Sequence, residues 1–253
     1  MTDSTANEPV DEVEARPRNA FLTFLRDLVV ILVIAFLVSF VVKTFLVRSF
    51  YIPSGSMKDT LQVDDRILVN QLSPELMAVE RGDVIVFTDP GGWLTARAVT
   101  PPSAFEWVLQ QVGLLADTSE EYVIKRVIGL PGDTVACCNP RGQLSVNGVP
   151  IKEPYVLLPE TGAPVSKDDF SVDIPAGSYW VMGDNRYASK DSRYNRDTPG
   201  KGFVLEDEIV GRAFVINWPF SRFGWLGSHP DSFAGVPDPA GTPAPAAQGP
   251  SGG

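Results

Sequence analysis

The sequence predicts an all-β protein: an antiparallel β-sheet domain with a small β subdomain and one short amphipathic helix, tethered by a single N-terminal transmembrane helix. Three observations support this fold class. One long apolar stretch lies near the N-terminus, many short stretches of alternating apolar and polar residues follow it, and turn residues separate those stretches. Many short strands with few helical segments are typical of an antiparallel β domain.

The apolar stretch predicts a membrane anchor over residues 21–47. Residues 28–42 are all apolar except Ser39, and a run of about 20 such residues is long enough to cross a bilayer. A cleaved signal peptide is the alternative, but it requires a shorter run followed by an Ala-x-Ala-like site, and residues 48–51 read RSFY. We therefore predict an uncleaved anchor.

Basic residues predict the orientation of this anchor. Arg16, Arg18 and Arg26 precede its core, whereas Lys43 and Arg48 lie at its far end. This narrow excess favours an N-terminus inside the cell and a β domain outside it.

Seven period-two stretches predict strands within residues 48–229, the limits of the predicted extracytoplasmic domain. They are residues 65–70, 83–88, 122–128, 143–147, 170–174, 178–182 and 209–218. Polar residues 1–20 are predicted to be a disordered cytoplasmic tail, and Pro/Ala/Gly-rich residues 230–253 a second disordered tail.

The short amphipathic helix is predicted over residues 104–116. It follows two prolines, and Ser103 with Glu106 matches a capping box. Apolar residues at helical spacing then lie on one face, while Trp107 and Leu114 lie on the opposite face. This second stripe either enters the membrane interface or is covered by protein, and the sequence leaves both interpretations open.

Composition excludes several classes of protein. The chain has 253 residues and a net charge of −10, whereas nucleic-acid-binding proteins normally carry a basic patch. Its one histidine, His229, adjoins the predicted tail, which excludes an HExxH zinc site, argues against a Ser-His-Asp triad and suggests a surface position. The adjacent cysteines, Cys137 and Cys138, form no zinc or CxxC motif, so we expect either a vicinal disulfide or buried thiols. No metal or cofactor is expected.

The segment PSGSMKDTL (residues 53–61) contains the candidate nucleophile, Ser56. Pro followed by two serines that flank a glycine predicts a tight turn, which can present one hydroxyl and aim neighbouring donors. Ser54 is then a candidate oxyanion donor. A plain hydroxyl-rich surface turn has the same composition, so this segment alone does not decide the function.

A lysine is the candidate base, because no histidine is suitably placed. Lys125 lies in the apolar stretch YVIKRVIG (residues 122–129), and burial lowers the pKa of a lysine so that it becomes a base near neutral pH. Arg126 must point to the opposite face of the strand. The alternative is that Lys125 points outward and Arg126 pairs with a carboxylate.

The segment MGDNRYASKDSR (residues 182–193) follows an apolar strand. Either Ser189 or Ser192 could orient a lysine amine, and a solvated polar turn is the alternative. Its charged residues are expected to form ion pairs that fix the loop: Asp184, Arg186, Asp191 and Arg193.

In this order, the segments resemble bacterial type I signal peptidases, which are membrane-anchored Ser/Lys endopeptidases. The resemblance rests on the anchor, PSGSMKDTL (53–61), RGDVIVF (81–87), YVIKRVIGLPGD (122–133) and MGDNRYASKDSR (182–193), and covers residues 21–220. Two positions depart from the family pattern. Asp59 stands where the family usually has proline, and Val123 stands where an aromatic residue is common, with Tyr122 displaced by one position.

The resemblance implies a role for individual residues. The nucleophile falls on Ser56, the general base on Lys125 and the hydroxyl that orients this base on Ser189. The oxyanion hole falls on the Ser54 hydroxyl and the Ser56 amide. Supporting charged positions fall on Asp184, Asp191 and Arg193. The residues of the substrate pockets correspond to Phe50, Ile52, Met57, Leu61 and Ile124.

The implied function is removal of signal peptides from secretory preproteins with Ala-x-Ala-like sites. The implied location is the cytoplasmic (inner) membrane of a bacterium, with membrane lipid as a partner and no nucleic acid. Two alternatives remain. A repressor-type Ser/Lys autoprotease is opposed by the anchor and the missing basic patch, and a non-catalytic membrane-tethered β scaffold is opposed by the presence of both Ser56 and Lys125.

Overall fold

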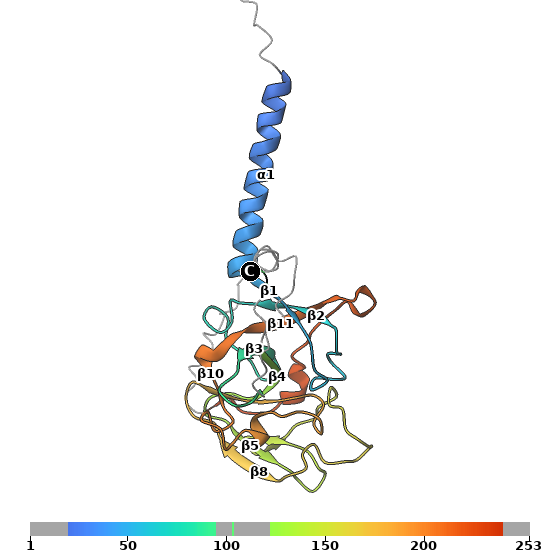
Figure 1. Ribbon diagram of the computed structural model, residues 1–253. Helices are drawn as coiled ribbons and strands as arrows, with labels where there is room; N and C mark the ends of the chain where they lie inside the picture. The colour runs from blue at the N-terminus through green and yellow to red at the C-terminus, as the bar shows by residue number, and fades with distance from the viewer. Residues whose placement is uncertain (1–19, 95–102, 104–121, 240–253) are drawn as a thin grey trace, which may run out of the picture. The chain divides into compact units, whose positions relative to one another are not determined.

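The computed structural model describes residues 20–94, 103 and 122–239 and divides into two compact units between Val41 and Val42. Helix α1 (Ala20–Phe45) supplies the described part of the first unit and appears in Figure 1 as one uninterrupted helix. Its segment Phe21–Phe40 has a mean hydropathy of 2.6, and none of its residues is buried inside the protein. The predicted N-terminal apolar helix is therefore confirmed, and it is long and apolar enough to cross a membrane.

The second unit is built on an eight-stranded antiparallel sheet. The strand order is β1-β2-β11-β3-β4-β9-β10, and β12 pairs with β11. The strands are β1 (Val47–Tyr51), β2 (Arg66–Asn70), β3 (Val84–Thr88), β4 (Tyr122–Gly129), β9 (Ser178–Met182), β10 (Val204–Leu205), β11 (Ile209–Trp218) and β12 (Gly224–Trp225).

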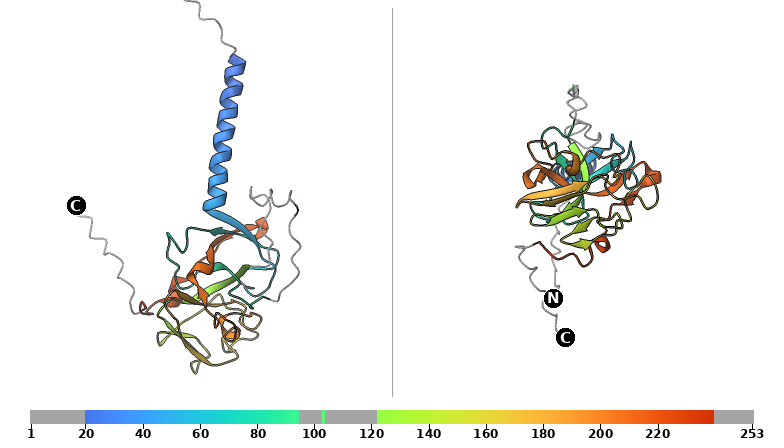
Figure 2. Two further views of the ribbon diagram at one scale, coloured as in Figure 1. Left: turned by 60° about the vertical axis from the view of Figure 1, so that its left-hand side comes forward. Right: turned by 90° about the horizontal axis from the view of Figure 1, so that it is seen from below.

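A smaller antiparallel sheet has the order β7-β6-β5-β8. Its strands are β5 (Thr134–Cys137), β6 (Ser145–Val146), β7 (Val149–Pro150) and β8 (Phe170–Asp173). It lies at the end of this unit away from β1 (Figure 1, Figure 2). Short 3₁₀ helices lie in the connections: η1 (Ser192–Tyr194), η2 (Glu206–Glu208), η3 (Phe220–Arg222) and η4 (Pro230–Phe233). The predicted fold class is confirmed.

Most predicted strands match the structure within one residue at each end. The exception is 143–147, where β6 and β7 form a hairpin that turns at Asn147 and Gly148, both with positive φ. Five strands were not predicted. Four of these, β5, β7, β10 and β12, have two to four residues, too few to show a period. The fifth, β1, begins two residues after the end of helix α1, so the sequence shows no turn signal that separates it from the apolar anchor.

The large sheet carries a separate apolar core on each face. Val84 and Val86 of β3 belong to one buried cluster, whereas Ile85 and Phe87 belong to another, because successive residues of a strand point to opposite faces. A third cluster fills the small sheet and includes Trp180 of β9, which is fully buried. Strand β9 therefore joins the two sheets through one apolar core.

The packed chain continues beyond residue 229, where composition predicted the C-terminal tail to begin. Phe233 is buried in the core of the small sheet. The carbonyl of Pro237 accepts hydrogen bonds from Arg81 at 2.9 Å and from Asn147 at 3.2 Å. Residues as far as Pro237 therefore contact the β unit, beyond the position at which composition predicted the tail to begin. The predicted helix 104–116, residues 1–19 and residues 240–253 lie outside the described residues.

The adjacent cysteines at the end of β5 are joined by a disulfide. Cys137 is buried in the core of the small sheet, and the amide of Cys138 donates to the Asp169 carboxylate at 3.0 Å. Of the two alternatives left open by the sequence, the structure contains the vicinal disulfide.

Candidate active site

The segment 53–61 forms a tight turn around Ser56. The amides of Thr60 and Leu61 both donate to the carbonyl of Met57, at 3.1 and 2.8 Å, and the amide of Lys58 donates to Gly55 at 3.1 Å. Met57 and Leu61 are fully buried. Apolar side chains and turn hydrogen bonds therefore fix the turn, and Ser56 stays at the edge of the core with 8% of its surface exposed.

Lys125 reaches this serine from the middle of β4. Its Nζ donates to Ser56 Oγ at 2.9 Å and to the carbonyl of Ile124 at 2.8 Å. Only 4% of Lys125 is exposed. Burial lowers its pKa from 10.5 to about 8, although the negative charges of Asp191 and Asp184 oppose this shift. The amine is therefore neutral in an appreciable fraction of molecules near neutral pH, and a neutral amine can accept a serine proton.

The predicted oxyanion donors lie beside the nucleophile. Ser54 is exposed, and its Oγ lies 3.3 Å from Ser56 Oγ. The amide of Ser56 donates to no acceptor among the described residues. Both groups are thus available to a negative charge that develops next to Ser56.

Ser189 packs against the turn of residues 53–61, called the nucleophile turn below, with Gly183 between them. A Cβ atom at Gly183 would lie 2.2 Å from Ser189 Oγ and 2.6 Å from the Ser56 carbonyl oxygen, so only glycine fits there. The Ser189 hydroxyl is buried and makes no hydrogen bond to any described residue, Lys125 included. Ser192 is the other candidate, and its Oγ instead accepts a hydrogen bond from the backbone amide of Val181 at 2.9 Å.

Two of the predicted charged residues form an ion pair behind Ser189. Asp191 accepts from Arg193 Nε and Nη2 at 2.9 and 2.8 Å, and from the amide of Gly183 at 3.0 Å. Burial alone would raise the pKa of Asp191, but these donors outweigh it and the pKa lies below its ordinary value. Asp191 therefore remains ionised, and it links the loop that carries Ser189 to Gly183, which lies next to the Ser56 carbonyl.

Both cations of β4 are buried, which resolves the choice that the sequence left open. Arg126 is fully buried and makes two hydrogen bonds to Asp184, at 2.9 and 2.7 Å. Thr60 of the nucleophile turn also donates to Asp184, at 2.5 Å. The side chain of Arg126 lies 4.0 Å from the ring centre of Tyr155. Arg126 is thus a structural cation, and Lys125 is the one that contacts the serine.

Sequence reasoning did not predict the ion pair between Glu153 and Arg186. Both side chains are buried, and two hydrogen bonds of 2.8 and 2.5 Å join them. Arg186 Nε also donates to the carbonyl of Gly183 at 3.1 Å. The arginine was visible within the charged segment 182–193, but no spacing in the sequence marks Glu153 as its partner.

The five predicted substrate-pocket residues lie together in one buried apolar cluster: Phe50, Ile52, Met57, Leu61 and Ile124. The displaced aromatic residue, Tyr122, packs edge-on against Phe50 with 5.2 Å between ring centres. Arg48 lies over both rings at 5.2 and 5.1 Å. Tyr122 thus covers this cluster from a position one residue earlier than the family pattern suggests.

Asp59, the other position that departs from the family pattern, has a backbone conformation that suits the substitution. Asp59 has a φ of 106°, a value that proline cannot adopt because its ring fixes φ near −65°. The side chain is exposed. The turn in this conformation therefore excludes the usual proline.

His229 is half-buried and keeps part of its surface exposed. Its ring lies 5.0 Å from the ring of Tyr155, and burial together with the charge of Arg126 lowers its pKa. It forms no hydrogen bond with Ser56. The serine therefore has Lys125 as its basic neighbour among the described residues.

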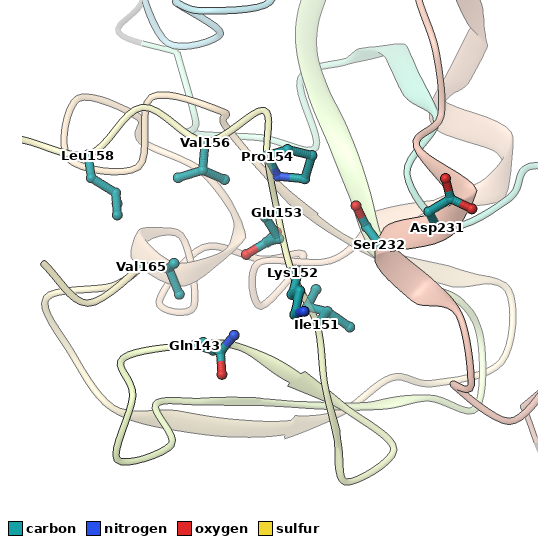
Figure 3. Close-up of a pocket in the computed structure, with 10 residues that line it drawn as sticks. All are labelled: Gln143, Ile151, Lys152, Glu153, Pro154, Val156, Leu158, Val165, Asp231 and Ser232. Atoms are coloured by element: carbon teal, nitrogen blue, oxygen red, sulfur yellow. The ribbon is translucent and has the colours of Figure 1, made fainter. Parts of the chain in front are cut away.

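A pocket of about 510 Å³ has a lining that does not include Ser56 (Figure 3). Most of its lining comes from residues 151–158, and the rest from Gln143, Val165, Asp231 and Ser232. None of the predicted site residues lines it. Within the described part of the chain, no group of three or more His, Cys, Asp or Glu residues is arranged to hold a metal ion.

Known proteins are similar to this chain over most of its length. The family described as signal peptidase, peptidase S26, matches residues 25–218. Signal peptidase I of Mycobacterium tuberculosis (strain H37Rv) is 37% identical over 228 residues, which cover 82% of this chain and 77% of that protein. Probable signal peptidase I of Mycobacterium leprae is 34% identical over 257 residues (90% and 86%), and signal peptidase I of Leptolyngbya laminosa is 37% identical over 192 residues (75% and 77%). Residues 25–218 contain every predicted site residue.

Proposed function

Because this chain belongs to the signal peptidase I family of serine peptidases (peptidase S26), we propose that Ser56 and Lys125 cut signal peptides from secretory preproteins. The observation that carries this proposal is the 2.9 Å contact between a buried lysine amine and a serine hydroxyl. A lowered lysine pKa of about 8 supports the role of general base.

The reaction begins when neutral Lys125 takes the proton of Ser56 as Oγ attacks the carbonyl carbon of the scissile peptide bond. The electron pair of this carbonyl moves to its oxygen, where the Ser54 hydroxyl and the Ser56 amide donate to it. One such donor is worth about 3 kcal/mol of barrier lowering. The intermediate collapses, the C–N bond breaks, and protonated Lys125 returns the proton to the leaving amine.

Water completes the cycle. Lys125, neutral again, takes a proton from a water molecule that attacks the acyl-enzyme ester, and Ser56 recovers its proton as the signal peptide is released. Asp191 and Arg193 hold the loop that carries Gly183 and Ser189, and Asp184 holds the turn through Thr60. We assign Ser189 the role of orienting the Lys125 amine once substrate is bound, when catalytic hydrogen bonds tighten.

The apolar cluster around Phe50 and Ile124 supports small, apolar substrate pockets. Such pockets suit an Ala-x-Ala-like sequence before the scissile bond. The apolar helix α1 supports membrane anchoring, and the distribution of basic residues supports an N-terminus in the cytoplasm with the β unit outside it. Secretory preproteins and membrane lipid are then the partners.

Cleavage of a preprotein with an Ala-x-Ala site by the purified full-length chain tests this proposal. We expect Ser56→Ala and Lys125→Ala each to abolish cleavage while the protein stays folded. Lys190→Ala is the matched control, because this lysine is exposed and, among the described residues, its amine donates to the carbonyl of Gly92 alone. Either dyad variant keeping more than a few per cent of activity at all pH values would refute the assignment.

A further inference from the structure

Asn185 contacts the nucleophile turn through two hydrogen bonds. Its backbone amide donates to the carbonyl of Ser56 at 3.0 Å, and its side-chain amide Nδ2 donates to the carbonyl of Gly55 at 3.1 Å. Since a carbonyl only accepts, the nitrogen and not the oxygen of this side chain must face Gly55. Asn185 therefore holds the peptide groups on both sides of Ser56.

The bond to Gly55 fixes the group that matters for catalysis. The carbonyl of Gly55 and the amide of Ser56 belong to one planar peptide unit, in which a trans bond points C=O and N–H in opposite directions. Anchoring the carbonyl on one side therefore aims the Ser56 N–H on the other. This N–H donates to no acceptor among the described residues.

Asn185 is itself held in place from behind. Its backbone forms a parallel β-bridge with Leu157, and the amide of Leu157 donates to the neighbouring Asp184 carbonyl at 2.8 Å. The carbonyl of Asn185 accepts from the amide of Ala188 at 3.1 Å. The side chain is half-buried. The asparagine thus offers the turn a fixed donor.

We propose that Asn185 is a positioning residue, whose side chain orients and polarises the Ser56 amide as an oxyanion donor. It does so without touching substrate: its hydrogen bond to the Gly55 carbonyl draws electron density toward that oxygen, which makes the N–H of the same peptide unit a stronger donor. This inference rests on the proposed function and extends it to a residue that the sequence did not mark as part of the site.

The inference predicts a particular kinetic change. Removing an oxyanion donor costs about 100- to 1,000-fold in kcat. In Asn185→Ala the Ser56 amide is still present, but its peptide unit keeps only the hydrogen bond that the Lys58 amide donates to the Gly55 carbonyl, so we expect kcat to fall about tenfold with KM unchanged. Asn185→Asp keeps the shape but places a carboxylate against the Gly55 carbonyl, which repels it, so we expect a larger loss, of about 100-fold.

The experiment compares cleavage with inhibition in the full-length chain. The inhibitor is a peptide aldehyde with the residues that precede the scissile bond; Ser56 Oγ adds to its carbonyl carbon, and the oxygen becomes an oxyanion. Rates are taken on the alkaline plateau, where a change in the Lys125 pKa has no effect. Tyr187→Phe is the control. It removes a hydrogen bond from a side chain of the same loop, the one that the Tyr187 hydroxyl donates to the carbonyl of Pro164.

The expected result is an equal loss in kcat/KM and in aldehyde affinity for each Asn185 variant, with a melting temperature equal to that of the control. Wild-type kcat in Asn185→Ala, unchanged aldehyde affinity, or a loss explained by unfolding would overturn the inference. If the wild type neither cleaves the preprotein nor binds the aldehyde, the proposed function fails instead.

Discussion

Replacing Lys125 by methionine should make the folded protein more stable at neutral pH, although it removes the proposed base. Burial lowers the pKa of Lys125 from 10.5 to about 8. One pKa unit corresponds to about 1.4 kcal/mol, so the charged form of this lysine destabilises the folded state by roughly 3 kcal/mol. Methionine has a similar length and no charge, so it fills the site without this penalty.

The effect has a defined pH dependence. Below about pH 8 Lys125 is protonated in both the folded and the unfolded state, and the full penalty is present. Between about pH 8 and 10.5 only the unfolded chain keeps the proton, so the stability of the wild type rises with pH. We compare the free energy of unfolding of the wild type with that of Lys125→Met. Between about pH 7 and pH 10, we expect the wild-type value to rise by about 2 to 3 kcal/mol relative to the value of the variant. The lost hydrogen bonds to Ser56 and Ile124 shift this difference by a constant amount and leave its pH dependence unchanged.

Urea unfolding of the full-length chain in detergent micelles, followed by tryptophan fluorescence, measures this difference. Lys190→Met is the control, because the side chain of Lys190 is exposed and its substitution should give a difference that does not change with pH. The same pKa must govern activity: the acid limb of kcat/KM should have its midpoint near pH 8. A difference between Lys125→Met and wild type that is independent of pH would refute the assignment of the lowered pKa to this lysine.

Five further substitutions, at four positions, test the packing around the site. Gly183→Ala should reduce cleavage at least about 100-fold, because its Cβ would displace Ser189 or the Ser56 backbone; near wild-type activity would contradict this. Ser189→Ala should lower kcat about fivefold, the value of one orienting hydrogen bond, and a change in KM alone would argue against that role. Asp59→Gly should raise the free energy of unfolding by about 1 kcal/mol by relieving a positive φ, whereas Asp59→Pro should lower it, and equal urea midpoints would refute this. Glu153→Gln should cost about 3 kcal/mol in urea unfolding, because Arg186 would remain buried without its countercharge; a loss below about 1 kcal/mol would show that the arginine finds another partner.

The sequence predicted the long strands and the two residues of the serine–lysine contact because both leave local signals. Strands β4, β9 and β11 have five to ten residues; β4 and β9 are buried along almost their whole length, whereas β11 alternates between buried and half-buried residues. The lysine was recognisable because an ammonium group inside an apolar strand is unfavourable unless it has a function.

The contacts that complete the site leave no such signal. Asn185 meets Gly55 across 130 residues, and Arg186 meets Glu153 across 33. Each contact depends on how two loops approach in three dimensions, and a polar residue in a loop has the same composition whether it is solvated or paired. For the same reason the composition of residues 230–239 predicted a tail, although Phe233 is part of a core.

The packing of Pro237 has a consequence for how the protein matures. Its carbonyl closes on Arg81, 156 residues earlier, and on Asn147, 90 residues earlier. The polypeptide must therefore be synthesised at least as far as Pro237 before these contacts can form, and contacts of such long range slow folding. A nascent chain that already contains Ser56 and Lys125 still lacks the two hydrogen bonds to the Pro237 carbonyl. If the β unit lies outside the cell, the chain must be exported as far as Pro237 before these contacts can form.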